Sequence, residues 1–445
     1  MSRHHNFTFV EEGLMNAMEI CEEDKKGQQS LAFLKKIFTH HPSRCFAIRL
    51  WDGSYLPPEV GQTRRFTLVI NHPGALRKLL WHPTQLGLGE AYVFKDLDIE
   101  GDLEVALKLP EVMDGLNIKW NEKISFAKWL LSLPTTDKAY KSHAAAPAHG
   151  EPADRERIRK VISYHYDLPV SFWKKVLDDS MQYSCAYFQS WEDDLNSAQI
   201  HKMDHICRKL MLKKGDNFLD VGCGWGSLIL HAAEHYGVHA VGVTLSDVQA
   251  NFANEQIRQR GLSSQCRVEQ VDIRDLTGWE RFNKIASVGS VEHAHSYMGD
   301  YFEAIWHLLK RGGLFLNHGI SSTFQYELPS ASQSFVNQYV FPDGEVDPLF
   351  LTMEIAEKTG FEIRDVENLR EHYAQTLRLW VENLERKQEG IRKVSGEITW
   401  RIFKLYMVGS ARNFSLGRLN LFQTLLTKSD RGHTPLPATR KGWYA

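Results

Sequence analysis

The sequence lacks several features that would assign it to a specialised class of protein. Its 445 residues contain no apolar run near the roughly 18 residues that a membrane span needs, and the N-terminus lacks the apolar core of a signal peptide. The six cysteines form no Cys-x-x-Cys pair, which predicts neither a zinc site nor a disulfide framework. We therefore expect no bound metal and a reducing, cytoplasmic location.

A strong charge of one sign is also missing. The formal net charge is -2, which gives no electrostatic reason to expect a nucleic acid partner. Hydrophobic residues make up 43% and charged residues 24%, as is ordinary for globular proteins. The length allows two or three domains.

Composition divides the chain into two domains. Residues 134–155 are rich in Ala, Pro and Gly without apolar periodicity, which is typical of a linker. Residues 1–133 predict a smaller α+β domain, with a helix at 31–38 and strands at 46–51 and 66–71. Residues 156–445 predict a larger domain that becomes a helix-rich insertion and tail between 331 and about 429.

The larger domain alternates apolar strand patterns with helical patterns, which indicates an α/β fold. The first predicted strand runs into a loop where Gly222, Gly224 and Gly226 occupy alternate positions. Because glycine has no side chain, such a loop lets the backbone approach a ligand closely, and we interpret it as a cofactor site. The predicted strands are residues 218–221, 240–243, 266–271, 284–288 and 313–318.

The residues around this loop favour S-adenosylmethionine (SAM) over a dinucleotide. A dinucleotide site uses Gly-x-Gly-x-x-Gly and an acid about 20 residues later. Here the second strand ends in Thr244 and Leu245, with no acid at its tip. Asp220 suits the amino-acid part of SAM, and Asp272, after the third strand, suits its adenine.

Several short motifs follow one another along the larger domain. They are Tyr183-Ser184-Cys185-Ala186-Tyr187-Phe188, Gly222-Cys223-Gly224-Trp225-Gly226, Val243-Thr244-Leu245-Ser246 with Gln249, Glu292-His293, and His372-Tyr373-Ala374-Gln375-Thr376-Leu377. With these motifs in this order, the chain from about residue 162 to 426 resembles the cyclopropane fatty acid synthases, which include the mycolic acid cyclopropane synthases. Residues 88–92 resemble, more loosely, the extra N-terminal domain of the longer bacterial members.

This resemblance implies a class I SAM-dependent methyltransferase (Rossmann-like) domain. It implies transfer of a methylene group from SAM to the double bond of an unsaturated acyl chain, usually in a phospholipid. It also implies a bicarbonate ion held by Cys185, Glu292, His318 and Tyr373. The implied SAM contacts are Tyr183, Ser184, the loop from Asp220 through Gly222 and Gly224 to Gly226, Thr244, Leu245, Gln249, Trp279 and Glu280.

The implied chemistry explains these residue types. An alkene that attacks the SAM methyl group becomes a carbocation, which must be kept from water and which aromatic faces stabilise. A base such as bicarbonate then removes a methyl proton so that the ring closes. We interpret Cys185 as part of the bicarbonate site and not as a covalent nucleophile. The aromatic residues expected to line the site are Tyr166, Tyr187, Phe188, Tyr297 and Trp380.

Other readings of the same residues remain open. Taken alone, Cys185, His318 and Tyr373 could be ordinary core residues, and Glu292 could be the start of a helix. The site could also form methyl- or methylene-branched acyl chains, methylate a small amine, or be an inactive methyltransferase fold that binds lipid. If the substrate is a phospholipid, we expect peripheral association with the inner face of the membrane. We also expect a homodimer.

Overall fold

The computed structural model describes residues 25–38, 44–81, 84–109, 111, 120–135, 151, 153–166, 168–326, 329–330, 332–342 and 344–444. The chain forms two compact units, Met1–Ala144 with Gln333–Phe335, and Ala145–Ser332 with Val336–Ala445. Most of the predicted linker, residues 136–150, lies outside the described residues.

The first unit contains a four-stranded sheet in the order β2-β1-β3-β4. Strand β1 (Phe46–Arg49) runs parallel to β3 (Phe66–Ile70), and it turns at Gly53 into the antiparallel β2 (Tyr55–Leu56). The predicted strands therefore exist, and β4 (Leu97–Gly101) completes the sheet. The helices are α2 (Pro73–Trp81), α3 (Gln85–Val93), α4 (Leu103–Ala106) and α6 (Trp120–Ser132).

The helix predicted at residues 31–38 is present and extends over 25–38. Its apolar side chains Leu34, Ile37 and Phe38 are buried in the unit's own core, and Phe33 stacks on Trp129 with ring centroids 4.7 Å apart. This apolar face is therefore part of the core of the first unit.

The second unit is built on a seven-stranded sheet in the order β10-β11-β9-β8-β5-β6-β7. The five strands predicted from sequence are present and run parallel, which confirms the α/β fold. Because they are parallel, their carboxyl ends meet at one edge, where polar loops can converge. They are β5 (Asn217–Val221), β6 (His239–Thr244), β7 (Cys266–Gln270), β8 (Phe282–Val288) and β9 (Leu309–Ser322).

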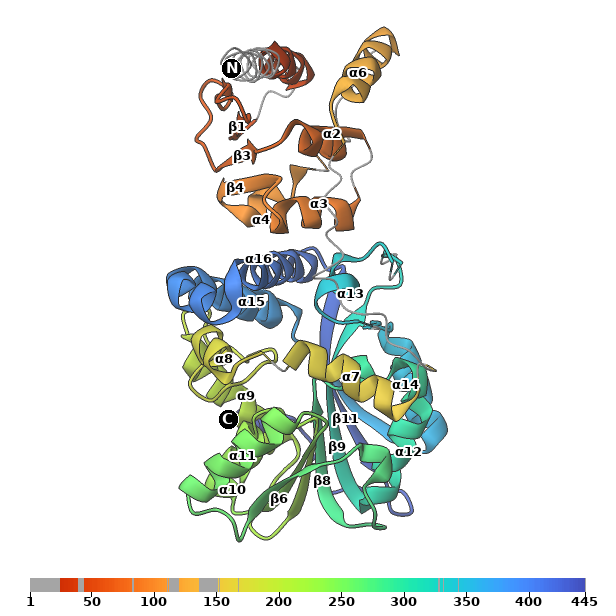
Figure 1. Ribbon diagram of the computed structural model, residues 1–445. Helices are drawn as coiled ribbons and strands as arrows, with labels where there is room; N and C mark the ends of the chain where they lie inside the picture. Colours follow the sequence, from red (N-terminus) through yellow and green to blue (C-terminus); the bar gives the residue numbers. More distant parts are fainter. Residues whose placement is uncertain are drawn as a thin grey trace, which may run out of the picture. The chain divides into compact units, whose positions relative to one another are not determined.

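Alternate side chains of this sheet enter two cores. Leu314 and Leu316 of β9 join the core under α9 (Leu195–Lys209), α10 (Ser227–Tyr236) and α11 (Asp247–Gln259). Phe315 joins the core under α12 (Met298–Leu308) and α14 (Leu349–Thr359). Figure 1 shows α10 and α11 on one side of the sheet and α12 and α14 on the other. The remaining helices are α7 (Arg155–Tyr166), α8 (Val170–Val176), α13 (Phe335–Tyr339), α15 (Arg370–Arg386) and α16 (Gln388–Ser415).

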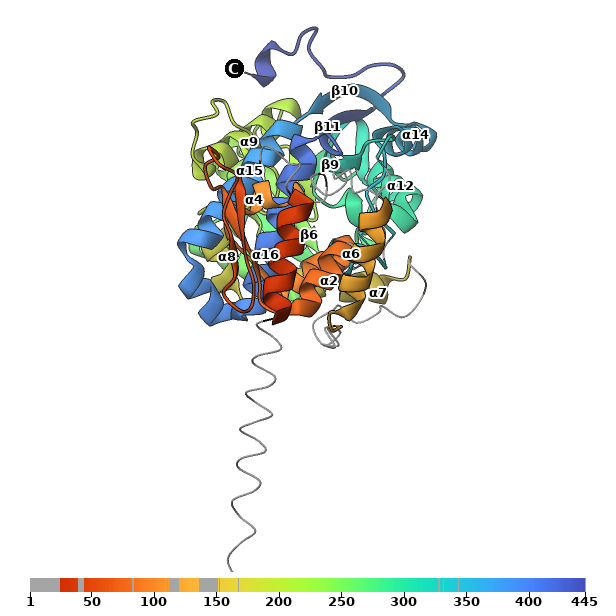
Figure 2. The same cartoon turned by 90° about the horizontal axis from the view of Figure 1, so that it is seen from above.

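The segment predicted to be a helix-rich insertion and tail also contains two antiparallel strands. Strand β11 (Leu419–Lys428) lies between β9 and the edge strand β10 (Glu362–Asn368). Beyond β11, the C-terminal segment runs past β10 and ends near α9 (Figure 2). The tail therefore packs against the sheet.

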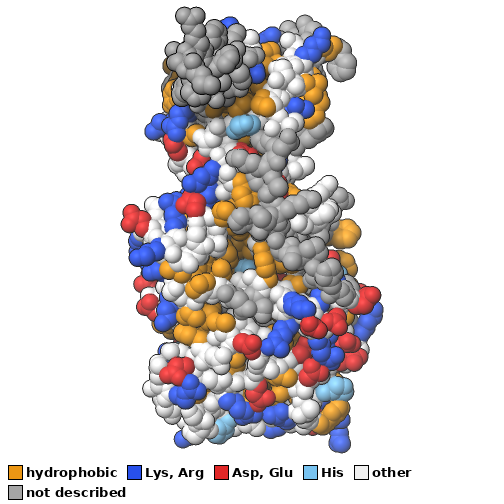
Figure 3. All heavy atoms as spheres, in the orientation of Figure 1, with side chains coloured by type: hydrophobic (Ala, Val, Ile, Leu, Met, Phe, Trp, Pro, Cys, Tyr) orange, Lys and Arg blue, Asp and Glu red, His pale blue; other side chains and the backbone are white. Residues whose placement is uncertain are grey.

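The described surface carries charges of both signs side by side, as the face drawn in Figure 3 shows for the second unit. This pattern agrees with the small net charge. Within the part of the chain that the structure describes, no helix has the length and apolar content needed to cross a bilayer.

Candidate active site

A cavity lies at the carboxyl ends of the parallel strands of the second unit. Its walls come from the ends of β5, β6, β7 and β8, from residues 181–184 between α8 and α9, and from α7 and α9. Of the residues predicted to bind a cofactor, nine line it: Tyr183, Ser184, Asp220, Gly222, Gly224, Thr244, Leu245, Gln249 and Asp272.

The glycine loop after β5 forms the floor of this cavity. Gly222 and Gly224 both have positive φ angles, +74° and +53°, which favour glycine. A Cβ at Gly222 would lie 1.8 Å from the Ser290 hydroxyl oxygen, whereas one at Gly224 would meet no atom within 4 Å. Gly226 was predicted to bind the cofactor, but it does not line the cavity. It lies just before α10, where the absence of a side chain lets Ala253 of α11 pack closely against the backbone.

Thr244, Gln249 and Asp272 form a polar part of the cavity wall. Thr244 donates to the amide oxygen of Gln249 over 2.8 Å. Both carboxylate oxygens of Asp272 accept hydrogen bonds from the Arg274 guanidinium, at 2.9 and 2.7 Å. Burial alone would raise the pKa of Asp272, but these hydrogen bonds lower it. Asp272 is therefore a fixed anion at the cavity wall.

Trp279 and Glu280 are not at this site, which corrects the prediction for both. They precede β8, whereas the cavity lies beyond its carboxyl end at Val288. Trp279 is 63% exposed, and the Glu280 carboxylate pairs with Lys428 at 3.3 Å. A loop before a parallel strand lies at the opposite edge of the sheet from a loop after it, so these side chains cannot reach the cavity.

Of the four residues predicted to hold bicarbonate, Cys185, His318 and Tyr373 are buried and Glu292 is half-buried, and none of them lines the cavity. Cys185 follows the lining residue Ser184, and Glu292 precedes the lining residue His293. Burial raises the pKa of Tyr373, and the nearby Tyr406, Cys185 and Glu292 raise it further. These couplings show that Cys185, Glu292 and Tyr373 are neighbours although they are far apart in sequence.

Cys185 is an inert thiol in this structure. Its sulfur lies 3.2 Å from the Ala186 carbonyl oxygen and 3.8 Å from that of Leu369, both acceptors. Burial raises the thiol pKa far above its ordinary value. A thiol that stays protonated is a poor nucleophile, which agrees with a role in a binding site.

Glu292 and His318 each keep one buried polar atom without a partner. Glu292 accepts a 2.7 Å hydrogen bond from the Ile320 amide at Oε1, but its Oε2 atom has none. The Nδ1 atom of His318 lies 3.1 Å from the Gln423 amide nitrogen, but its Nε2 atom has none. Burial raises the pKa of Glu292 to about 7 and lowers that of His318 well below its usual range.

Unsatisfied buried polar atoms are costly, and a small polar ligand would supply the missing partners of these two. Bicarbonate has a hydroxyl that can donate to Glu292 and oxygens that can accept from His318 and Tyr373. The side chains present therefore fit this ion.

The buried face of α9 carries a row of polar residues that was not predicted from the sequence. Gln199 donates to the Ser184 carbonyl oxygen over 3.0 Å, and Lys202 donates to the Ser184 hydroxyl over 2.7 Å and to the Gln182 side chain. Lys202 lines the cavity, and burial lowers its pKa to about 8. Residues 199, 202, 205 and 209 are all buried and polar, and this helical spacing was the available signal.

The aromatic predictions are met in part. Tyr166 and Tyr297 line the cavity, and Trp380 packs against Tyr183 with ring centroids 5.1 Å apart. Tyr187 and Phe188 do not line it. Tyr187 instead stacks between the rings of His205 and His372, and the Phe188 amide donates to His372.

Comparison with known families gives two matches. A family described as mycolic acid cyclopropane synthetase matches residues 153–424, which contain the cavity and the residues around it. A second family, described only as a domain of unknown function, matches residues 33–109 of the first unit.

Individual proteins give a consistent result. The chain is 35% identical over 409 residues to a probable fatty acid methyltransferase of Pseudomonas putida, covering 91% of this chain and 97% of the relative. The cyclopropane synthase MmaA2 from Mycobacterium tuberculosis superimposes with a TM-score of 0.58 at 29% identity, covering 60% of this chain and 97% of that one. The mycolic acid cyclopropane synthase CmaA1, solved with SAH and CTAB, gives 0.57 at 31% identity, with shares of 60% and 97%.

Proposed function

The chain belongs to the mycolic acid cyclopropane synthetase family of SAM-dependent methyltransferases, and we propose that it converts the double bond of an unsaturated, phospholipid-bound acyl chain into a cyclopropane. The observation that carries this proposal is the pair of unpartnered buried atoms, Glu292 Oε2 and His318 Nε2, next to the cofactor cavity. A site that only methylates amines has no evident need for a buried oxyanion.

The cavity residues would bind SAM, which supplies an electrophilic methyl group when bound. Gly222 and Gly224 leave room for it, and Asp220 has a buried carboxylate oxygen without a partner, suited to its ammonium group. Burial raises the pKa of Asp220 to about 7, although the nearby Lys202 opposes this. A cation bound beside Asp220 would favour its ionised form.

The buried aromatic residues would protect the carbocation. Tyr166, Tyr183 and Tyr297 line the cavity, and the rings of Trp173 and Trp380 lie 4.6 and 5.1 Å from that of Tyr183. Aromatic faces attract cations, and a site without water prevents formation of an alcohol.

The remaining residues would hold bicarbonate, which supplies the base that removes one proton from the transferred methyl group. Glu292 would accept the hydrogen of its hydroxyl, while His318 and Tyr373 would donate to its oxygens. Cys185 would close the site as a neutral thiol. The electron pair left on carbon then closes the three-membered ring.

Incubation of the purified protein with SAM and unsaturated phospholipid vesicles tests the proposal. We expect an acyl product that is heavier by one CH2 group and resists hydrogenation under conditions that saturate alkenes. A product of the same mass that contains a branched methylene group would replace the cyclopropane assignment. Methylation of a small amine without lipid product would favour an N-methyltransferase, and absence of SAM binding would favour an inactive fold.

Lys202 gives a prediction about cofactor affinity. Lys202→Met removes the buried ammonium that holds the hydroxyl of Ser184 at the cavity. A hydrogen bond to a charged group contributes about 1.5–3 kcal/mol, so we expect SAM affinity to fall roughly tenfold to a hundredfold in calorimetry. The control is Lys160→Met, which removes an exposed lysine paired with Glu156 on α7. Equal affinities in the two variants would exclude this role.

A further inference from the structure

Three buried polar side chains form a row across neighbouring strands of the second unit. Glu367 of β10 is opposite Gln423 of β11, which is in turn opposite His318 of β9. Residues in register on adjacent strands project from the same face of the sheet, toward α9 in this case. Gln423 and His318 have no exposed surface.

The contact between Gln423 and His318 has a direction. Gln423 Nε2 lies 3.1 Å from His318 Nδ1, and an amide nitrogen can only donate a hydrogen bond. In this orientation of the Gln423 amide, Nδ1 is the acceptor and the hydrogen of the neutral ring lies on Nε2. The low pKa of His318 keeps the ring neutral.

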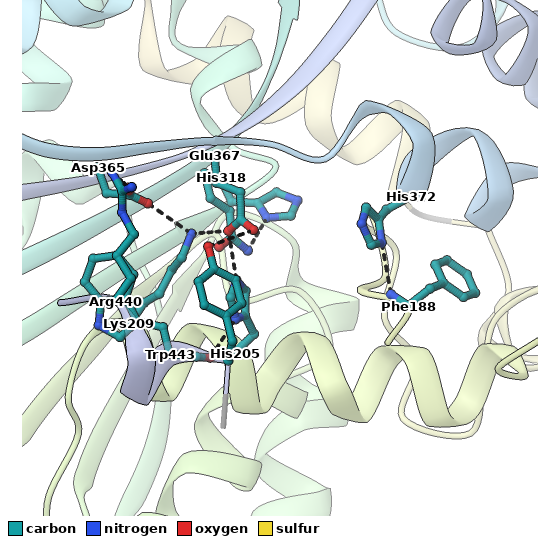
Figure 4. A network of polar contacts seen from close by, with 11 residues as sticks. Phe188, His205, Lys209, His318, Asp365, Glu367, His372, Arg440 and Trp443 are labelled. Carbon is teal, nitrogen blue, oxygen red and sulfur yellow. Dashed lines mark hydrogen bonds and ion pairs between the residues drawn. The ribbon is translucent and has the colours of Figure 1, made fainter. Parts of the chain in front are cut away.

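Residues of α9 and of the C-terminal tail contact Glu367, at one end of this row. Glu367 accepts hydrogen bonds from His205 at 2.9 Å, from Tyr444 at 3.2 Å and from Lys209 (Figure 4). Asp365, two residues earlier, pairs with Lys209 at 3.5 Å and with Arg440 of the tail at 2.6 Å. Burial would raise the pKa of Glu367, but His205 and Lys209 lower it to about 2, so Glu367 stays ionised.

This cluster fixes the pairing of β10 with β11. In it, the carboxylates of Asp365 and Glu367 pair with the cationic side chains of Lys209 and Arg440. The Trp443 carbonyl oxygen lies 3.2 Å from His205 Nδ1. The register of β10 and β11 places Glu367 opposite Gln423, and the contact between Gln423 and His318 is buried away from water.

We propose that Gln423 is a positioning residue that holds His318 in the Nε2–H form, so that His318 donates a hydrogen bond to the oxyanion of the reaction. The importance of this form for catalysis rests on the proposed function, whereas the position of the proton does not. Gln423 itself touches neither SAM nor the substrate in this scheme.

The variant Gln423→Glu tests the proposal with almost no change of shape. A carboxylate can only accept, so it requires a proton on His318 Nδ1. Nitrogen NMR of protein labelled at histidine distinguishes the two forms, with the His318 signals assigned by their loss in His318→Asn. We expect Nε2–H in the wild type and protonation of Nδ1 in Gln423→Glu at pH above neutral.

Turnover of the variant should fall roughly a hundredfold, because Nε2 of His318 then has no hydrogen to donate to the oxyanion. SAM affinity measured by calorimetry should not change. Thr427→Val is the matched control on the same strand, since it removes a buried 2.9 Å hydrogen bond to Gly313 without touching the row. It should lower stability but preserve the His318 signals and turnover.

The outcomes separate this inference from the proposed function. A wild-type spectrum with hydrogen on Nδ1 overturns the inference even if the variant does not fold. A variant with hydrogen on Nδ1 alone, and none on Nε2, but with full turnover also overturns it. If the wild type makes no lipid product but shows Nε2–H controlled by Gln423, the proposed function fails and the positioning by Gln423 stands.

Discussion

Replacing Glu292 with glutamine is expected to lower the rate of alkyl transfer roughly a hundredfold to ten-thousandfold, the usual contribution of a positioned acid–base group. Glutamine keeps the shape and can still accept the hydrogen bond from the Ile320 amide. It cannot carry the negative charge that orients bicarbonate as a base. SAM affinity should be preserved, because Glu292 does not line the cofactor cavity.

The same variant is expected to be more stable than the wild type above neutral pH. Burial raises the pKa of Glu292 from 4.5 to about 7, so between these values the folded protein keeps a proton that the unfolded chain releases. The free energy of unfolding therefore falls as pH rises from 4.5 to about 7, and stays lower above that. Glu292→Gln removes this decrease in the free energy of unfolding, which reaches about 3 kcal/mol in the wild type.

Denaturant unfolding at acidic and alkaline pH measures this effect. The stability difference between variant and wild type should be large above pH 7 and close to zero near pH 4.5. Glu303→Gln, at an exposed position of α12, is the control and should show neither change. A fully active Glu292→Gln variant would remove Glu292 from the proposed mechanism.

Replacing Gly224 with valine is expected to abolish measurable SAM binding. A Cβ at this position meets no protein atom within 4 Å, so the branched side chain would occupy the cavity where the cofactor must lie. We expect affinity to fall at least roughly a hundredfold, or about 2.7 kcal/mol, in calorimetry. Circular dichroism should show a preserved fold.

Backbone strain is a separate effect that needs its own control. Gly224 has a φ of +53°, where a residue with a side chain costs about 1–2 kcal/mol. Gly261, exposed in the turn after α11, has a φ of +70° and equally open space. Gly261→Val should therefore lower stability to a similar extent but leave SAM affinity intact. Similar affinities for the two valine variants would place the cofactor elsewhere.

Local patterns in the sequence were sufficient to predict the parallel strands and the glycine loop. Buried parallel strands are continuous apolar runs, and the loop after β5 needs glycine at fixed positions. Strand β10 was missed because Glu362–Asn368 has the sequence EIRDVEN, in which charged residues outnumber apolar ones. Its place at the edge of the sheet comes from pairing with β11, which its own sequence does not indicate.

The position of a motif in the sheet explains the remaining differences. Trp279 and Glu280 fit the family pattern by residue type, but they come before a strand and therefore lie at the wrong edge. Lys202 and Gln423 carry no motif, and they gain significance only from their partners Ser184 and His318. Reactive residues can be recognised in a sequence by their motifs. The residues that position them are recognised only from their contacts in the structure.

The position of β11 between β9 and β10 has a consequence for synthesis on the ribosome. Strands β9 and β10 are both made before β11, yet β11 must pair between them. At 5–20 residues per second, on the order of ten seconds separate the end of β9 from the end of β11. During this interval the long, apolar β9 exposes an unpaired edge, which is a template for aggregation. Gln423 comes to lie beside His318 only when this last strand is inserted.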